Sequence, residues 1–346
     1  MTSADPRIPT LVLAGFLGSG KTTMLNHLLR NQIGVRIGVI VNDFGAVNID
    51  ALLVAGQVDS AISIGNGCVC CVSDVAELDA MLDRLSQRGA GIDAIIIEAS
   101  GLAEPRELIR MIAGSTVDRI RYGGLIEVVD AAEYPANRIA HPELDQHVRL
   151  ADLVVLNKAD RLTPDALAEL RAELEPLCGP VPIVTTAHGR LDPTLLFDER
   201  ELTLPDGPRQ MTIDEILAEI EAESTSADIH SHLHTDFDSI SFESPQPLHP
   251  RRLMDLLQNS PAGLYRVKGL VSLGDAAAAE AFEVQTVGRH ITVRRSPRPR
   301  DPMTRLVAIG AGIDASALTD GLARCVSGPD EKMDENAMFS VLRFLG

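Results

Sequence analysis

The stretch Gly15-Phe-Leu-Gly18-Ser19-Gly20-Lys21-Thr22 follows the apolar run 11–13 and precedes a segment, 21–30, with helical apolar spacing. It fits the pattern G-x-x-x-x-G-K-[ST] between a strand and a helix. Glycines let backbone N–H groups turn toward phosphate oxygens, and the helix N-terminus adds a positive dipole. The stretch therefore predicts a phosphate-binding loop at the start of an α/β fold.

The pattern also assigns roles to the polar residues of this loop. We expect Lys21 to reach the β- and γ-phosphates and to act in catalysis, and Thr22 to offer its hydroxyl to Mg²⁺. The expected nucleotide contacts from the loop are Gly15, Gly18, Ser19, Gly20, Lys21, Thr22 and Thr23. A glycine-rich turn with a solvated lysine is the alternative, and the strand and helix on either side argue against it.

Outward from the loop, residues 10–185 alternate short apolar runs with amphipathic stretches. Buried strands are expected at 11–13, 37–41, 94–97, 124–129, 153–156 and 181–184, and helices at 21–30, 74–88, 104–113, 143–150 and 164–175. This alternation predicts the P-loop NTPase type of α/β fold, a mainly parallel sheet with helices on both faces. Ligands then belong at the carboxyl ends of the strands.

The pattern changes after residue 198. Residues 199–235 are rich in acidic and small residues and are interpreted as a linker, whereas 236–346 predict a smaller C-terminal α+β domain. Its strands are expected at 237–242, 263–271, 282–287, 290–294 and 306–309, and its helices at 250–258 and 315–324. The predicted P-loop domain is 1–198.

Composition limits the classes of function. The 346 residues are enough for two domains, and 31 basic against 49 acidic residues give a net charge of −18, which disfavours nucleic acid and anionic membranes as partners. The first residues predict neither a signal peptide nor a transmembrane helix. The five cysteines are not evenly spaced as in a disulfide scaffold, so reduced thiols and a cytoplasmic location are expected.

Asn157-Lys158-Ala-Asp160 follows the apolar run 153–156 and predicts a guanine-binding loop. The Asp160 carboxylate can accept hydrogen bonds from N1–H and the exocyclic amine of guanine, and adenine offers neither donor there. GTP is therefore favoured over ATP. The segment 185–187 could close over the base, although an ordinary loop fits it nearly as well.

Two further acids follow predicted strands. Glu98 is expected to hold Mg²⁺ through water or to orient the attacking water, and Gly101 to contact the γ-phosphate through its amide. A helix-capping carboxylate is the alternative for Glu98. Asp43, in the sequence Asn42-Asp43-Phe44-Gly45, is a third catalytic candidate as a contact to Mg²⁺, water or a second metal, although a plain turn also fits.

Three thiols stand within four residues, at Cys68, Cys70 and Cys71, flanked by glycines. Three thiolates at about 2.3 Å would bind Zn²⁺ and leave one tetrahedral position open, as an exchangeable site requires. Soft thiolates also accept Cu(I), and Co²⁺ or Ni²⁺ where availability favours them. The alternatives are packing cysteines or a redox pair.

Other metal-ligating residue types carry weaker signals. Alternating His230, His232 and His234 could form a secondary metal site, but a solvated loop is the preferred interpretation. Cys178 and Cys325 stand alone and are expected to pack in the core.

Taken together, these residues resemble the CobW-like family of GTP-dependent metallochaperones, within the P-loop GTPases that include nickel-insertion proteins. The resemblance rests on GFLGSGKTT (15–23), NDFGAVNID (42–50), GCVCC (67–71), IIIEASGLAEP (95–105), NKAD (157–160), SISF (239–242), LYRVKGLV (264–271) and RLVAIG (305–310). The last three are similar to the C-terminal module of that family specifically. Departures include Asp43 where glutamate is common, and Ala46 and Asn66 where an acid and a glycine are common.

The resemblance implies a slow, metal-regulated GTPase that loads a transition metal and delivers it to a client metalloprotein. Zn²⁺ is the leading cargo and Co²⁺ the next, and related nucleotide switches often form homodimers. Two other classes stay open. One is a non-enzymatic thiol regulator of metal or redox state that uses nucleotide structurally. The other is a small-molecule kinase, which the guanine motif and the lack of an acceptor site disfavour.

Overall fold

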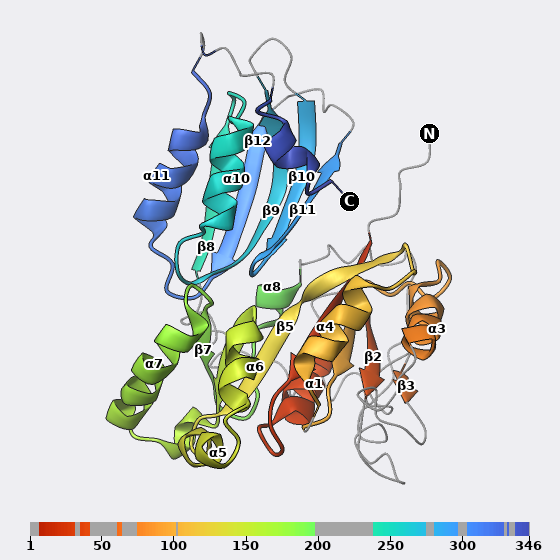
Figure 1. Ribbon diagram of the computed structural model, residues 1–346, viewed down its shortest axis with the longest axis vertical. Coiled ribbons are helices and arrows are strands. Elements are labelled where there is room, and N and C mark those ends of the chain that lie inside the picture. The colour runs from red at the N-terminus through yellow and green to blue at the C-terminus, as the bar shows by residue number, and fades with distance from the viewer. Residues whose placement is uncertain are drawn as a thin grey trace, which may run out of the picture.

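Two β-sheets organise the part of the chain that the computed structural model describes, namely residues 7–31, 35–41, 61–63, 75–101, 103–197, 238–274, 280–296, 303–328, 331 and 336–345. The first sheet has seven parallel strands in the order β3-β2-β4-β1-β5-β6-β7. The second has five antiparallel strands in the order β11-β10-β9-β12-β8. Figure 1 shows the second sheet above the first.

The first sheet contains β1 (Ile8–Ala14), β2 (Ile37–Val41), β3 (Ala61–Ser63), β4 (Ala94–Glu98), β5 (Ile120–Asp130), β6 (Leu153–Asn157) and β7 (Ile183–Thr185). Its helices are α1 (Lys21–Arg30), α3 (Val75–Ser86), α4 (Pro105–Ala113), α5 (Tyr134–Ala140), α6 (Leu144–Leu150), α7 (Pro164–Cys178) and α8 (Pro193–Leu196), with a 3-10 turn η1 (Ala159–Arg161). Strands β2, β4 and β6 are buried at every position. Such strands require cover on both faces of the sheet.

Helices provide that cover. On one face, α1 and α8 pack through Met24, Leu25 and Leu195 into a core shared with alternate residues of β1 and β5. On the other face, α3 and α4 contribute Leu82 and Leu108 to one cluster, and α6 and α7 contribute to a second. The expected doubly covered parallel sheet is confirmed.

The order of the strands places a reversal of winding direction at the centre of this sheet. Strand β1 lies between β4 and β5, and the chain runs from β1 to one side for β2, β3 and β4 before crossing to the other side for β5. Where the direction of winding reverses, the loops at the carboxyl ends of the strands separate and leave room for a ligand. The phosphate-binding loop occupies this point because it follows β1 directly.

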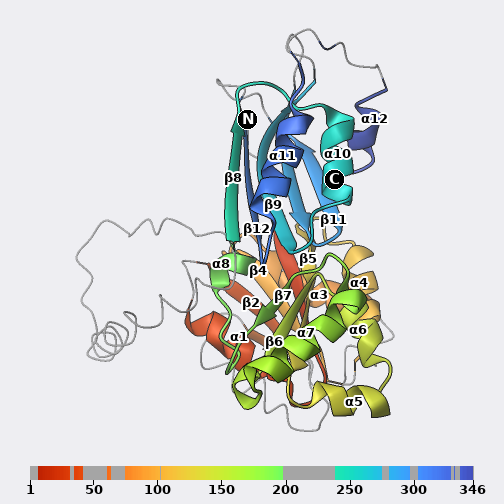
Figure 2. The same ribbon diagram turned by 90° about the vertical axis from the view of Figure 1, so that its left-hand side faces the viewer.

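The second sheet contains β8 (Asp238–Ser244), β9 (Leu264–Leu273), β10 (Glu280–Val287), β11 (His290–Arg295) and β12 (Thr304–Gly310). Helices α10 (Pro250–Gln258), α11 (Ala315–Cys325) and α12 (Phe339–Leu342) pack with it around one apolar cluster. The C-terminal residues join this cluster through Val341, and Val293 N–H donates to the Phe344 carbonyl. Figure 2 shows α10 and α11 beside the sheet.

The two sheets are joined by direct contacts. Tyr265, Val287 and Ala311 of the C-terminal part belong to the core cluster that includes β1 and α1. Asp152, just before β6, accepts hydrogen bonds from Tyr122 Oη at 2.7 Å, Leu125 N–H at 2.9 Å and Arg289 N–H at 3.4 Å. A buried carboxylate with three donors therefore links the N-terminal sheet to the β10–β11 turn.

Most expected elements appear within a few residues of their predicted ends, and helices 21–30 and 250–258 match in full. The patterns missed short pieces, namely β3, α5, α8, η1 and α12, because three to seven residues carry too little periodicity. The predicted domain boundaries lie outside the described residues. Within the described residues, no helix combines the length and apolarity needed to cross a bilayer.

Candidate nucleotide site

Two backbone positions of the loop between β1 and α1 require glycine. Gly15 has φ of 148° and Gly20, which caps α1, has φ of 104°. A Cβ on Gly15 would collide with the Val128 carbonyl of β5, and one on Gly20 would collide with the Asn157 amide of β6. The loop therefore follows the neighbouring strands closely, which only a residue without a side chain permits.

Lys21 folds back over this loop from the first residue of α1. Its Nζ donates to the carbonyl oxygens of Gly15 at 2.8 Å and Phe16 at 3.2 Å, and the residue is only 8% exposed. Ser19 is also buried, and its Oγ has no hydrogen-bond partner among the described residues. The loop thus gathers a cation and an unpaired hydroxyl, the two kinds of group that a phosphate would engage.

Thr22 and Glu98, both expected near Mg²⁺, meet directly. Thr22 Oγ1 donates to Glu98 Oε1 at 2.6 Å, and Glu98 is 3% exposed at the end of β4. Hydroxyl and carboxylate oxygens are the hard donors that Mg²⁺ prefers. The donor set therefore fits the ion that the sequence predicts here. Thr23, the next residue of α1, is exposed.

Gly101 lies against the same loop. A Cβ on Gly101 would fall 2.8 Å from the Leu17 backbone nitrogen and 2.9 Å from its Cα. Heavy atoms do not approach a real Cβ this closely, so a side chain at 101 would displace the backbone of one of the two segments. The loop after β4 and the phosphate-binding loop are therefore in contact, as a contact between Gly101 and a γ-phosphate would require.

Asn157 and Asp160 of the motif 157–160 have different environments, one buried and the other exposed. Asn157 is buried, donates from Nδ2 to the Ser19 carbonyl at 2.8 Å, and accepts at Oδ1 from Gly189 N–H at 2.9 Å. Asn157 thus ties the phosphate-binding loop to the loop after β7. Asp160, in η1, is exposed and available to a base. The loop 185–187 contacts η1 because the Thr186 carbonyl accepts from Ala159 N–H at 3.1 Å.

Lys158, directly after β6, contacts the phosphate-binding loop and the end of β5. It has φ of 60°, and its Nζ donates to the Gly18 carbonyl at 2.6 Å and to Asp130 Oδ2 at 2.6 Å. Gly18, with φ of 73°, has open space around its Cα. Lys158 therefore joins the phosphate-binding loop to the end of β5.

Asp130 was not predicted as a site residue, although it accepts a hydrogen bond from Lys158 of the guanine motif. It ends β5, binds Lys158, and accepts at Oδ1 from the N–H groups of Ala132 at 3.1 Å and Glu133 at 3.2 Å. The signal was available, because Asp130 follows the apolar run 124–129 as Glu98 follows 94–97.

Glu127, also on β5, was missed as well. It is 2% exposed, and its Oε2 has no hydrogen-bond partner among the described residues. Burial raises the pKa of Glu127 to about 8, and the nearby positive charge of Lys21 opposes that rise. A single acid inside an otherwise apolar strand was the signal that could have found it.

Several predicted residues lie outside the described part of the chain: Asp43, Cys68, Cys70, Cys71, His230, His232 and His234. Their roles stay predictions. Within the described ranges, no group of three or more His, Cys, Asp or Glu side chains is arranged to hold a metal ion. Cys178 and Cys325 are buried and reduced, and burial raises the pKa of each thiol to about 11, so the packing role predicted for them is confirmed.

The family model described as "CobW/HypB/UreG, nucleotide-binding domain" matches residues 9–185, which include the phosphate-binding loop, Glu98, Gly101 and the motif 157–160. The chain belongs to this family. A second model, "Cobalamin synthesis protein cobW C-terminal domain", matches residues 237–326. The family resemblance and the fold predicted from the sequence are therefore confirmed.

Individual relatives carry related names. The chain is 36% identical over 229 residues to "Zinc chaperone CobW" of Pseudomonas aeruginosa, covering 55% of this chain and 60% of that protein. It is 29% identical over 340 residues to "Zinc chaperone CobW" of Sinorhizobium sp, covering 89% and 87%. It is 33% identical over 204 residues to "Zinc chaperone YjiA" of Escherichia coli, covering 58% and 64%. The match thus spans less than two thirds of the first and third relatives.

Among solved structures, the chain is similar to the Zn(II)-bound YjiA GTPase from E. coli. The sequences are 24% identical, the match covers 94% of this chain and all of that chain, and the TM-score is 0.43.

Proposed function

We propose that this chain is a GTP-hydrolysing metallochaperone that binds Zn²⁺ as cargo and transfers it to a client metalloprotein. One observation carries the nucleotide half of the proposal. Lys21, the Thr22–Glu98 pair and the Asn157–Lys158 contacts converge on one edge of the parallel sheet. Phosphate, Mg²⁺ and guanine groups of one nucleotide would be bound there together.

In this proposal the loop amides and Lys21 bind the phosphates, and Asp160 selects guanine. Lys21 must exchange its bonds to two loop carbonyls for bonds to phosphate oxygens, which its flexible stem allows. Asn157 does not touch the base but holds the two loops at a fixed separation. That arrangement supports binding of a complete nucleoside triphosphate.

Hydrolysis requires charge neutralisation and an oriented water. Thr22 would hold Mg²⁺ directly and Glu98 through water, and the ion, when bound, neutralises developing charge on the β- and γ-phosphates. Glu98 or Asp43 would orient the water, and the Gly101 amide would contact the γ-phosphate. We expect turnover to be slow and to depend on the metal cargo.

The cargo half rests on Cys68, Cys70 and Cys71 and on the names of the relatives, which are zinc chaperones. Zn²⁺ is the proposed cargo and Co²⁺ the second candidate, because three thiolates accept both. GTP and metal must each tighten the other's binding by the same factor if one state of the protein binds both best. We place the transfer in the cytoplasm, by a homodimer, without nucleic acid or membrane.

The deciding experiment is competition with a chelator for Zn²⁺ and Co²⁺, on the apo, GDP-bound and GTP-analogue-bound protein. We expect stoichiometric Zn²⁺ binding that tightens with GTP analogue and Mg²⁺. Cys68→Ser should abolish the tightening, and Cys178→Ala, which removes a buried packing thiol, should preserve it. A zinc affinity that is the same with and without bound nucleotide would contradict the proposal. So would a zinc affinity of Cys68→Ser that still tightens fully with GTP analogue.

A further inference from the structure

A cavity of about 570 Å³ lies between the two sheets, at the opposite end of the parallel sheet from the nucleotide site. Its walls include the residues just before or at the start of three strands, Arg7 at β1, Asp93 at β4 and Arg119 at β5. The nucleotide loops follow the other ends of the same strands. The cavity is therefore a separate place on the molecule.

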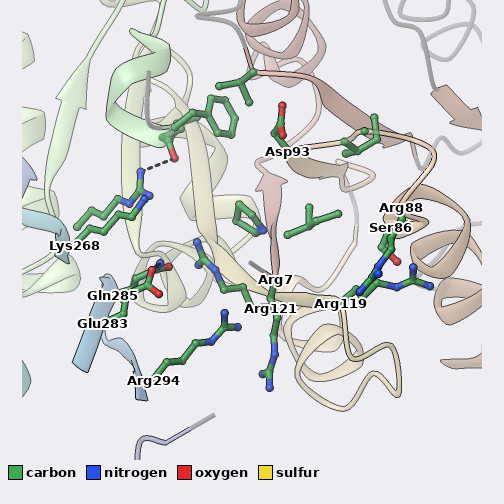
Figure 3. A pocket seen from close by; sticks show the side chains of 18 of the residues that line it. Arg7, Ser86, Arg88, Asp93, Arg119, Arg121, Lys268, Glu283, Gln285 and Arg294 are labelled. Atoms are coloured by element: carbon green, nitrogen blue, oxygen red, sulfur yellow. Dashed lines mark hydrogen bonds between the residues drawn. The ribbon is translucent and has the colours of Figure 1, made fainter. Parts of the chain in front are cut away.

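The second sheet forms the facing wall. In the register of β9, β10 and β11, Lys268 lies opposite Gln285, and Glu283 lies opposite Arg294. These side chains share one face of the sheet, because Val267, Val284 and Val293 point the other way into the apolar cluster with α10 and α11. Figure 3 shows this group on one side, Arg7 and Arg121 in the middle, and Arg88 and Arg119 on the far side.

The lining is strongly basic. It contains six arginines and one lysine but only two carboxylates, Asp93 and Glu283, whereas the whole chain has a net charge of −18. Like charges gathered in a recess repel one another, and an anionic ligand would relieve that repulsion. Arginine predominates, and its planar fork matches phosphate oxygens in a bidentate way.

Arg294 marks the point where an anion would bind. Its Nη2 is buried and has no hydrogen-bond partner among the described residues. Burial lowers the pKa of Arg294, and the neighbouring charge of Arg7 lowers it further, although Glu283 opposes both. A buried guanidinium nitrogen without an acceptor is costly, and an anionic ligand would supply that acceptor.

The alternative is that these cations only join the two sheets. Arg266 has such a role, because it is buried and its Nη1 donates to the Leu196 carbonyl of α8 at 3.2 Å. That contact joins the two parts of the chain, yet the cavity volume of about 570 Å³ is within the range of small-molecule sites, about 300–1,000 Å³. A purely structural contact would fill this space with side chains.

We propose that this cavity binds a small anion carrying two or more linked phosphate groups, held between Arg294 and Lys268 on one side and Arg121 on the other. Bound there, the anion touches both sheets and stabilises their present arrangement. The site is separate from the proposed GTPase and zinc functions, since its lining residues Arg7, Asp93 and Arg119 lie at the opposite ends of the strands that the nucleotide loops follow.

The test is calorimetric titration of the full-length protein with pyrophosphate. Because pyrophosphate can also enter the phosphate-binding loop, titrations are run with excess Mg·GDP and repeated on Lys21→Ala. Binding that persists in both is binding outside that loop. We expect one pyrophosphate per chain under both conditions.

Variants locate the site. Arg294→Gln and Lys268→Gln should each weaken pyrophosphate binding roughly tenfold, because each removes one cation from a desolvated contact. Arg295→Gln is the matched control. It removes the same charge from the next residue of β11, which is exposed and does not line the cavity. Melting temperatures show whether each variant is folded. If one of the two lining variants is unfolded, pyrophosphate binding by the other variant tests the site.

Two further probes define the class of ligand. Citrate should bind at least about tenfold more weakly than pyrophosphate, because its carboxylates carry less charge per group. Equal binding of citrate would overturn the phosphate assignment, and binding of a polyglutamate peptide without binding of pyrophosphate would indicate a protein partner instead. Absence of pyrophosphate binding, or binding unchanged by both lining variants, would overturn the site itself.

Discussion

Thr22 Oγ1 and Glu98 Oε1 are joined by a 2.6 Å hydrogen bond between residues 76 positions apart in the sequence. The bond connects the first turn of α1 to the end of β4, so both oxygens face the edge where β1 meets its neighbour. A hydroxyl and a buried carboxylate at this distance form a natural oxygen site for a divalent cation.

Thr22→Ala should therefore weaken Mg²⁺-dependent GTP binding by roughly one to two orders of magnitude, because it removes a hydrogen bond to a charged group and a ligand of the ion. Titration of GTP analogue with and without Mg²⁺ measures the effect. The neighbouring Thr23→Ala, at an exposed position, is the control and should change the Mg²⁺ dependence much less. Equal effects of the two substitutions would contradict the assignment of Thr22.

Asp160 should determine the base. Asp160→Asn replaces one acceptor by an amide donor, which conflicts with the exocyclic amine of guanine but suits the carbonyl of xanthine at that position. We expect GTP affinity to fall by about 100-fold and XTP affinity to rise. Competition binding with GTP, XTP and ATP checks this, and an unchanged preference for GTP would remove Asp160 from the site.

Asp130 should position the guanine loop through Lys158. Asp130→Ala removes the acceptor of a 2.6 Å ion pair whose carboxylate side chain is 10% exposed, and should weaken GTP binding roughly tenfold. Glu133→Ala is the comparison, since the ion pair of Glu133 with Arg161 is about half exposed and should contribute little, and the backbone N–H that Glu133 donates to Asp130 is kept. If the two variants bind nucleotide with the same affinity, Lys158 is held in place by contacts other than the one with Asp130.

Glu127 predicts a dependence of stability on pH. Its pKa is about 8 in the folded protein against 4.5 for an ordinary glutamate, so the folded state binds the extra proton between these values. Stability from this group is therefore greatest below pH 4.5 and falls as pH rises toward 8, by up to about 1.4 kcal/mol per pH unit.

Glu127→Gln removes this contribution. Denaturant unfolding of both proteins from pH 5 to 8 should show the variant gaining stability relative to the parent as pH rises. Glu107→Gln is the control, because Glu107 is exposed and forms only a surface pair with Arg110. A stability difference that is flat with pH would mean that Glu127 is not a buried, protonated acid.

Asp152 should stabilise the contact between the two sheets. Asp152→Ala leaves three donors, including a buried one, without their acceptor and should lower the free energy of unfolding by about 2–4 kcal/mol. Glu243→Ala, which breaks the exposed pair with Arg305, should cost under about 1 kcal/mol. Urea unfolding distinguishes the two, and similar values would show that Asp152 is not essential to the contact.

Local sequence was enough to predict the longer helices and strands and the position of the phosphate-binding loop. Helices 21–30 and 250–258 were predictable because apolar spacing, proline and glycine act over one or two turns. The loop was predictable because its glycines and Lys21 lie within the short stretch 15–21, directly after an apolar strand.

Only the tertiary structure decided which distant residues share a site. Asn157 Nδ2 reaches the Ser19 carbonyl across 138 positions, and Asp130 gains its role only because β5 lies beside β1 and β6. The basic cavity depends even more on tertiary structure, since Arg121 and Arg294 belong to different sheets and no local sequence pattern links them. Burial and charge repulsion depend on three-dimensional distance, and distance between separate segments is a property of packing and not of spacing along the chain.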